Sequence, residues 1–170
     1  MSLKSTFLAT PLGSMLAISD KEKLYLLDFA ERKGLERKIK MLNVKTKLPI
    51  IDGNTKPISS VEKELKSYFD GNLQKFNTSL CLVGSEFQQL VWEKLMNVPY
   101  GETRSYFTQA KAVSKETAYR AVANANGANR FAIIIPCHRI INNNGELGGY
   151  GSGLHRKKWL IEHERKFIIN

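Results

Sequence analysis

The chain has 170 residues, of which 42% are hydrophobic and 25% are charged, an ordinary balance for a soluble globular protein. Its formal net charge of +10, from 26 Lys and Arg against 16 Asp and Glu, favours a polyanionic partner such as a nucleic acid. A basic surface that serves solubility alone is the alternative that composition leaves open. The length allows one large domain or two small ones, with a core that needs no disulfides or metals.

Disulfides, metal centres and membrane spans find no support in the residue pattern. The two cysteines, Cys81 and Cys137, stand in different contexts and fit a reducing compartment. The three histidines form no spaced ligand set with them, so we expect neither a metal nor another cofactor. Polar residues interrupt the N-terminal apolar stretch, and no run approaches the roughly 18 apolar residues of a membrane helix. We therefore expect a soluble, cytoplasmic protein.

The first half of the chain has the pattern of a mixed α/β fold. Residues 14–18 and 23–29 are apolar runs on either side of polar residues 20–22, which predicts a β-hairpin. Residues 34–43 have the apolar spacing of a basic helix. A further helix is predicted to open at the capping box Ser59-x-x-Glu62. No catalytic or ligand-binding motif occurs here, so we interpret residues 1–80 as a scaffold domain.

A boundary near residues 80–84 separates this half from a second domain, residues 81–170. Ser85-x-x-Gln88 is another capping box, and the helix that it opens should end before Pro99-Tyr100-Gly101.

Two helical segments, about 105–113 and 116–126, are joined across a tight turn at residues 113–115, which fits a helix-turn-helix. The second segment is rich in alanine. Small side chains let a backbone approach a narrow DNA minor groove, but alanine is also simply a good helix former for a core. Arg120 favours the DNA interpretation, because an unpaired arginine in a core would be costly.

Residues 133–141 contain the candidate catalytic residues. An apolar β-branched run is followed there by Cys137, His138 and Arg139. We expect a strand that holds the cysteine toward a pocket. A single cysteine is most often a small buried hydrophobe. Here, neighbouring basic groups favour the thiolate and therefore a nucleophile.

Residues 135–140, Ile-Pro-Cys-His-Arg-Ile, closely resemble the active-site signature of the O6-methylguanine-DNA methyltransferases, also called O6-alkylguanine-DNA alkyltransferases. The resemblance extends from about Phe87 to Glu164. Supporting stretches occur in matching order and spacing: Pro99-Tyr100-Gly101-Glu102-Thr103, Ser105-Tyr106, Arg120-Ala121-Val122, Ala128-Asn129, Gly148-Gly149-Tyr150 and Trp159-Leu160. The first half resembles the family only in length and expected architecture. The implied fold is a ribonuclease H-like α/β domain followed by a mostly helical domain with a helix-turn-helix and an active-site strand or loop.

The resemblance also implies catalytic roles. Cys137 would accept the alkyl group, and His138 would act through a water as its base, oriented by Glu164. Asn129 would brace the turn before the active-site strand. Tyr106 would help to rotate the base out and could protonate the departing guanine.

Further residues would contact the substrate or the DNA. Arg120 would fill the gap that the flipped nucleotide leaves in the base stack. The other positions that the resemblance assigns to binding are Tyr150, Gly151, Ser152, Ala121, Ser105 and Arg139.

The implied function is repair of double-stranded DNA that contains O6-alkylguanine, in one irreversible turnover by a monomer without an obligate protein partner. The lesion lies inside the duplex, so the base must be extruded before a sulfur can reach it. The chain departs from the family pattern at residues 113–116, where glycine and proline are common, and at Gly151, where serine is common. Phe107 and Gln109 are also unusual choices.

Other classes compete with this interpretation. A non-catalytic damage binder of the same fold would replace the cysteine, often with tryptophan, and Cys137 argues against it. A cysteine hydrolase would need an oxyanion hole, and no hydrolase signature surrounds Cys137. A transcriptional helix-turn-helix regulator would lack an obvious dimerisation element here.

Overall fold

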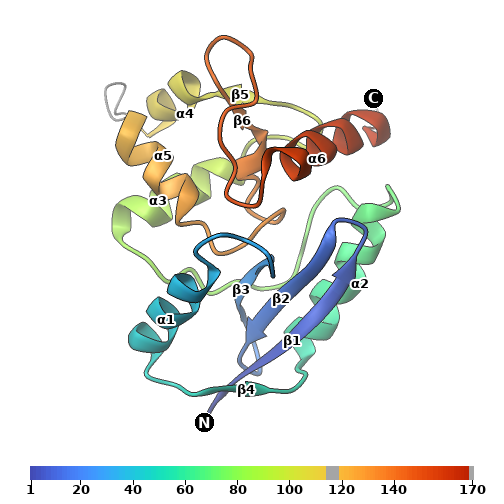
Figure 1. The fold of residues 1–170 in the computed structure, drawn as a ribbon, viewed down its shortest axis with the longest axis vertical. Helices are drawn as coiled ribbons and strands as arrows, with labels where there is room; N and C mark the ends of the chain where they lie inside the picture. The colour runs from blue at the N-terminus through green and yellow to red at the C-terminus, as the bar shows by residue number, and fades with distance from the viewer. Residues whose placement is uncertain (114–118, 169–170) are drawn as a thin grey trace. The chain divides into compact units, whose positions relative to one another are not determined.

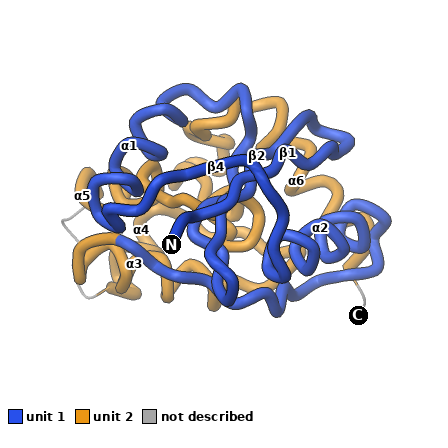
Figure 2. The backbone as a smooth tube through the Cα atoms, turned by 90° about the horizontal axis from the view of Figure 1, so that it is seen from below, with its two compact units in different colours: residues 1–83 blue, residues 84–170 orange. Residues whose placement is uncertain are grey.

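The computed structural model describes residues 1–113 and 119–168 (Figure 1). The chain divides into two compact units, Met1–Val83 and Gly84–Asn170 (Figure 2). No helix among the described residues is both long enough and apolar enough to cross a membrane.

The N-terminal unit is built on one four-stranded sheet of order β3-β2-β1-β4. Its strands are β1 (Leu3–Thr10), β2 (Gly13–Ser19), β3 (Leu24–Phe29) and β4 (Ile50–Asp52). The first three pair antiparallel, whereas β4 pairs parallel with β1. The predicted hairpin between β2 and β3 is confirmed, as is the mixed α/β character of this half.

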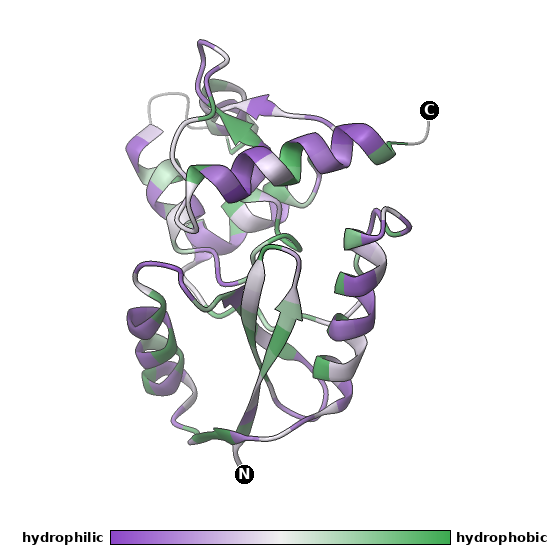
Figure 3. Cartoon of the chain, turned by 45° about the vertical axis from the view of Figure 1, so that its right-hand side comes forward, coloured by the Kyte–Doolittle hydropathy of each residue, from purple (hydrophilic) through white to green (hydrophobic). Residues whose placement is uncertain are grey.

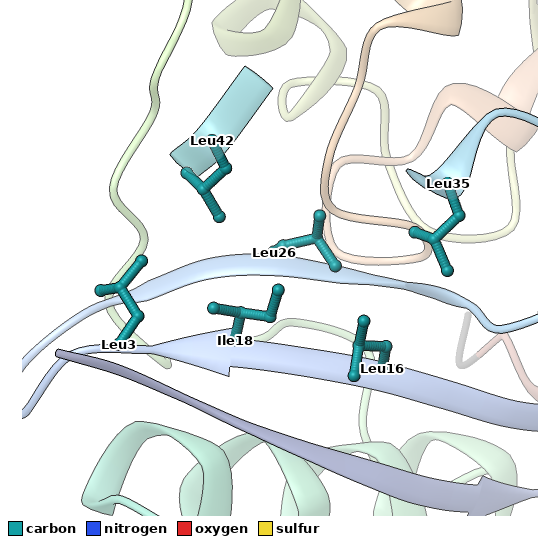
Figure 4. Close-up of a cluster of buried hydrophobic side chains, with 6 residues drawn as sticks. All are labelled: Leu3, Leu16, Ile18, Leu26, Leu35 and Leu42. Atoms are coloured by element: carbon teal, nitrogen blue, oxygen red, sulfur yellow. The ribbon is translucent and has the colours of Figure 1, made fainter. Parts of the chain in front are cut away.

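Two helices, α1 (Leu35–Thr46) and α2 (Lys56–Phe69), cover opposite faces of this sheet. Apolar colour concentrates along the central strands, while the helices mix apolar and polar residues (Figure 3). On one face a buried cluster joins α1 to the strands (Figure 4): Leu3, Leu16, Ile18, Leu26, Leu35 and Leu42. The spacing of Leu35 and Leu42, seven residues apart, puts both on the side of α1 that meets the sheet.

The predicted start of α2 is wrong by four residues. Thr55 is the N-cap, and its side chain accepts a hydrogen bond of 3.2 Å from the Ile58 N–H. Pro57 lies in the first turn, where its missing N–H costs nothing. Ser59 therefore lies inside the helix and cannot cap it.

The C-terminal unit is mostly helical. Its helices are α3 (Glu86–Leu95), α4 (Tyr106–Ala112), α5 (Tyr119–Gly127) and α6 (Leu154–Phe167). Two short strands, β5 (Arg104–Ser105) and β6 (Ile140–Ile141), pair in parallel. The capping box at the start of α3 is confirmed, because both of its reciprocal bonds between Ser85 and Gln88 are present.

Helices α3, α4 and α5 pack against one another through buried polar bonds as well as apolar side chains. The Trp92 indole N–H donates to the Ala125 carbonyl at 2.8 Å, which ties α3 to α5. Gln109 and Asn126 exchange two amide hydrogen bonds of 2.6 and 2.8 Å, which tie α4 to α5. The two helices of the expected helix-turn-helix are thus present, but most of its turn lies outside the described residues.

The active-site segment is predicted as a strand or loop, and the strand part of this prediction is wrong. The segment that leads to Cys137 is a turn, in which Ile133 has a φ of 73°, followed by the 3-10 helix Cys137–Arg139. Pro136 has no N–H to offer a neighbouring strand. The Ile135 N–H is already used locally, since it donates to the Phe131 carbonyl at 3.0 Å. The strand β6 begins at Ile140, three residues after the cysteine.

Candidate active site

The side chain of Asn129 organises the turn that leads to the cysteine. Its amide N–H groups donate to the carbonyls of Ile135 at 2.9 Å and Phe131 at 3.3 Å, and its oxygen accepts from the Phe131 N–H at 2.9 Å. The same amide nitrogen lies 3.4 Å from the sulfur of Cys137. Asn129 is buried and Cys137 is half-buried, so a rigid polar group holds a partly accessible sulfur.

A buried carboxylate lies beyond the cysteine and binds its two successors in the chain. Glu164 Oε2 is 2.7 Å from His138 Nε2, and Glu164 Oε1 accepts from Arg139 Nε at 2.7 Å. Arg139 also donates to the Val98 carbonyl at 2.6 Å. Burial acts to raise the pKa of Glu164, but His138 and Arg139 together lower it well below its usual range. Glu164 is therefore ionised and oriented at neutral pH.

The imidazole of His138 is fully buried, and its two nitrogens have different surroundings. Nε2 faces Glu164, whereas Nδ1 has no hydrogen-bond partner among the residues that the structure describes. A carboxylate on one side of an imidazole favours the proton on that side and leaves the other nitrogen basic. His138 is thus set up to accept a proton at Nδ1.

Lys157 is a site residue that the sequence did not reveal. Its side chain is fully buried in α6, and Nζ donates to the carbonyls of Ile140 at 2.5 Å and Gly149 at 3.1 Å. Burial lowers the pKa of Lys157 to about 8, and the nearby Cys137 sulfur opposes that shift. An ammonium group beside the sulfur favours the thiolate.

Residues 156–158 are three consecutive basic residues, a pattern typical of a solvated helix face, but the first two are buried. Arg156 and Lys157 are 5% and 0% exposed, and Arg156 donates to the Ser152 carbonyl at 2.9 Å. The signal that could have found Lys157 is its distance of seven residues from Glu164. Two helical turns place both on the same face of α6.

The other predicted catalytic residue, Tyr106, begins α4. Burial raises its pKa above the usual 10, and the nearby Cys137 adds to that shift. Its phenol therefore keeps its proton at neutral pH. Ser105, the residue before it, is the N-cap of α4 and accepts a hydrogen bond of 3.1 Å from the Thr108 N–H.

The predicted binding residues fall into three places. Arg120 and Ala121 are exposed on α5. In the loop before α6, Tyr150 is half-buried, Gly151 is exposed and Ser152 is buried. Arg139 is buried beside Glu164, so its contacts support a positioning role and not one at the surface.

No group of three or more His, Cys, Asp or Glu side chains suited to a metal ion occurs in the part of the chain that the structure describes. The groups that the structure brings together here are the sulfur of Cys137, the buried imidazole of His138 and the phenol of Tyr106.

Comparisons with known proteins identify the family of this chain. The family model "6-O-methylguanine DNA methyltransferase, DNA binding domain" matches residues 86–166. A methylated-DNA--protein-cysteine methyltransferase of Methanosarcina barkeri is 40% identical over 155 residues, covering 91% of this chain and 92% of the relative. The chain belongs to the methylated-DNA--protein-cysteine methyltransferase family. The resemblance carried by residues 135–140 is confirmed.

Solved structures extend the likeness of this methyltransferase to its N-terminal unit. The Mycobacterium tuberculosis O6-methylguanine methyltransferase is 36% identical, with a TM-score of 0.82 over 98% of this chain and 95% of that one. The M. tuberculosis protein in complex with DNA is 35% identical, with a TM-score of 0.81 over 98% and 94% of the two chains. The α/β fold class is confirmed across both halves, although the sequence of the first half carried no family motif.

Proposed function

We propose that this chain repairs DNA by transferring the alkyl group of an O6-alkylguanine to the sulfur of Cys137, once per molecule. The observation that carries the proposal is the sulfur held at 3.4 Å by Asn129, beside a buried His138–Glu164 pair, in a chain of this family. We infer that it acts as a monomer on double-stranded DNA in the cytoplasm.

The reaction is a displacement at the alkyl carbon. A water relays the thiol proton of Cys137 to His138 Nδ1, and the imidazolium that forms is stabilised by Glu164. The thiolate forms the new S–C bond while the C–O bond breaks and its electron pair stays with guanine. Tyr106 donates a proton to the departing base. The product is a thioether, which the groups at this site have no means to reverse.

The sulfur can reach the alkyl group only if the protein binds the duplex and turns the base out of it. The family model names a DNA-binding domain over residues 86–166, and a relative has been solved in complex with DNA. We infer that α4 and α5 act as a helix-turn-helix, with the exposed face of α5 in the minor groove and Arg120 in the gap left by the flipped base. The loop at Tyr150, Gly151 and Ser152 would close over that base.

We also infer how the two halves of the chain divide the work of scaffold and catalysis. Residues 1–80 would be a ribonuclease H-like scaffold, supported by a mixed sheet with a helix on each face. Residues 81–170 would form the DNA-binding and catalytic domain.

The direct test is incubation of the protein with a duplex that carries one labelled O6-methylguanine. We expect transfer to stop at one methyl group per chain, with the label located on Cys137 by mass spectrometry. Several equivalents transferred per chain, or label on another residue, would contradict the proposal.

Replacing Arg120 by alanine should slow repair by about 10- to 100-fold. Base extrusion costs a few kcal/mol, and each 1.4 kcal/mol corresponds to about a factor of ten. Single-turnover rates on the methylated duplex measure this effect. Alkylation of Cys137 by iodoacetamide should be unchanged, because the thiol is untouched. Arg165→Ala, an exposed arginine on α6, is the control; equal slowing in both variants would remove the specific role of Arg120.

A further inference from the structure

Three side chains outside the proposed chemistry form a column on α4 and α5. Lys111 Nζ lies 5.3 Å from the centre of the Phe107 ring, and that ring stacks on Tyr119 with centroids 6.3 Å apart and planes at 30°. Phe107 is 40% exposed and Tyr119 is 39% exposed. Large rings with this much exposure on adjacent helices form a contiguous apolar patch beside a cation.

Helix packing alone does not account for the column. The contact between α4 and α5 is already made by the reciprocal amide bonds of Gln109 and Asn126, and by the buried Val122. The column adds an aromatic surface outside that contact. The backbone of Phe107 is also fixed, because its N–H donates to the Asn143 side chain at 3.1 Å. This bond holds the backbone at the centre of the column in place.

Its position on α5 suggests the partner. Tyr119 directly precedes Arg120 and Ala121, which are exposed on the helix that we place in the minor groove. The minor groove is only about 6 Å wide, and a sugar-phosphate backbone borders it on either side. Side chains at the flank of a groove-bound helix meet that backbone and not the base edges.

We propose that Lys111, Phe107 and Tyr119 bind the sugar-phosphate backbone of one DNA strand beside α5, on undamaged sequence as well as at the lesion. Lys111 pairs with a phosphate, the Tyr119 hydroxyl donates to a phosphate oxygen, and the aromatic rings cover a deoxyribose. This inference rests on the proposed function in taking duplex DNA as the partner and α5 as the helix that lies in its minor groove.

Backbone contact fits the column better than stacking on unpaired bases. Proteins that hold single strands stack successive bases on the faces of aromatic rings. The Phe107 ring already has an ammonium group and a second ring against it, so it offers little free face. A cation and a hydroxyl can bind phosphate, and the edge of an aromatic ring can pack against a sugar.

The test is equilibrium binding of the full chain to an undamaged duplex across a series of salt concentrations. Loss of one phosphate contact in Lys111→Gln should make the slope of log K against log salt shallower by about 0.9. We expect affinity near 0.1 M salt to fall by about fivefold, equally for methylated and unmethylated duplexes.

Lys166→Gln is the matched control. Lys166 is exposed, and its replacement by glutamine removes the same charge. Its Nζ also lies over an aromatic ring, 5.1 Å from the centre of Phe167 on α6. Its slope should equal that of the unaltered chain. An unchanged slope for Lys111→Gln, or an equal change in both variants, would overturn the proposal.

Tyr119→Leu and Phe107→Leu test the rings separately from the charge. Each should weaken duplex binding by about threefold with little change in the salt slope, while thermal unfolding shows that the fold is kept. A loss confined to single-stranded DNA would instead make the column a base-stacking site and refute backbone contact. Undamaged duplex carries no alkyl group, so these outcomes do not depend on whether Cys137 accepts one.

Discussion

A Cys137→Ser variant is expected to transfer no alkyl group above background while binding methylated duplex as tightly as the unaltered chain. A serine hydroxyl has nearly the volume of a thiol, but it does not ionise near neutral pH and is a far weaker nucleophile. The bonds of Asn129 to the carbonyls of Ile135 and Phe131 do not involve the sulfur, so the turn should persist. Label transfer followed over hours measures the loss of alkyl transfer, and a binding isotherm measures the affinity for methylated duplex.

Cys81→Ser is the control for this experiment. Cys81 is the other free cysteine, half-buried in the N-terminal unit, and its serine variant should still accept one methyl group per chain. Transfer by the Cys137→Ser variant would move the acceptor to another residue. Loss of DNA binding by that variant would instead show that the sulfur has a structural part in recognition.

The sequence revealed most about features that depend on local order. The capping box at Ser85 and Gln88 and the hairpin of β2 and β3 each need only a few adjacent residues, and both are confirmed. The motif around Cys137 identified the family because its residues are contiguous. The partnership of His138 with Glu164 came from the family resemblance, since 26 residues separate the two.

The errors arose where a side chain outside the segment overrides the local preference of the segment. Residues 133–135 have a strong β pattern, yet the Asn129 amide binds the carbonyls of Phe131 and Ile135 and keeps this segment in a turn. Lys157 lies in a run of basic residues that has the pattern of a solvated surface. Its burial depends on the carbonyls of Ile140 and Gly149, which only the tertiary fold brings to its side chain. Gln109, an unusual residue for the family, is explained only by its buried partner Asn126.

Replacing Glu164 by glutamine should lower the free energy of unfolding at neutral pH by about 3–5 kcal/mol. Glu164 is buried and pairs with Arg139 and His138, so a neutral amide leaves the Arg139 charge buried without its counter-ion. The reaction with methylated duplex should also slow, because His138 loses the carboxylate that orients it and stabilises its charged form. Denaturant unfolding and single-turnover rates measure the two effects.

Glu162→Gln, on the same helix, provides the comparison. The Glu162 side chain is 64% exposed and lies 4.0 Å from Lys158, so its loss should change stability by no more than about 0.5 kcal/mol. Similar unfolding curves for the two variants would mean that the buried network contributes little.

The pH dependence of unfolding gives an independent check on Glu164. Its pKa in the folded chain lies below the ordinary value of 4.5, so the unfolded chain binds the proton more readily. The stabilisation is therefore complete above about pH 4.5 and is lost as the pH falls from there toward the lower folded-state pKa. The unaltered chain should lose stability steeply over that acidic range, whereas the Glu164→Gln variant should show a shallower decline, because position 164 no longer titrates. Parallel declines in the two proteins would place the acid sensitivity on other carboxylates and remove Glu164 as the main buried anion of the site.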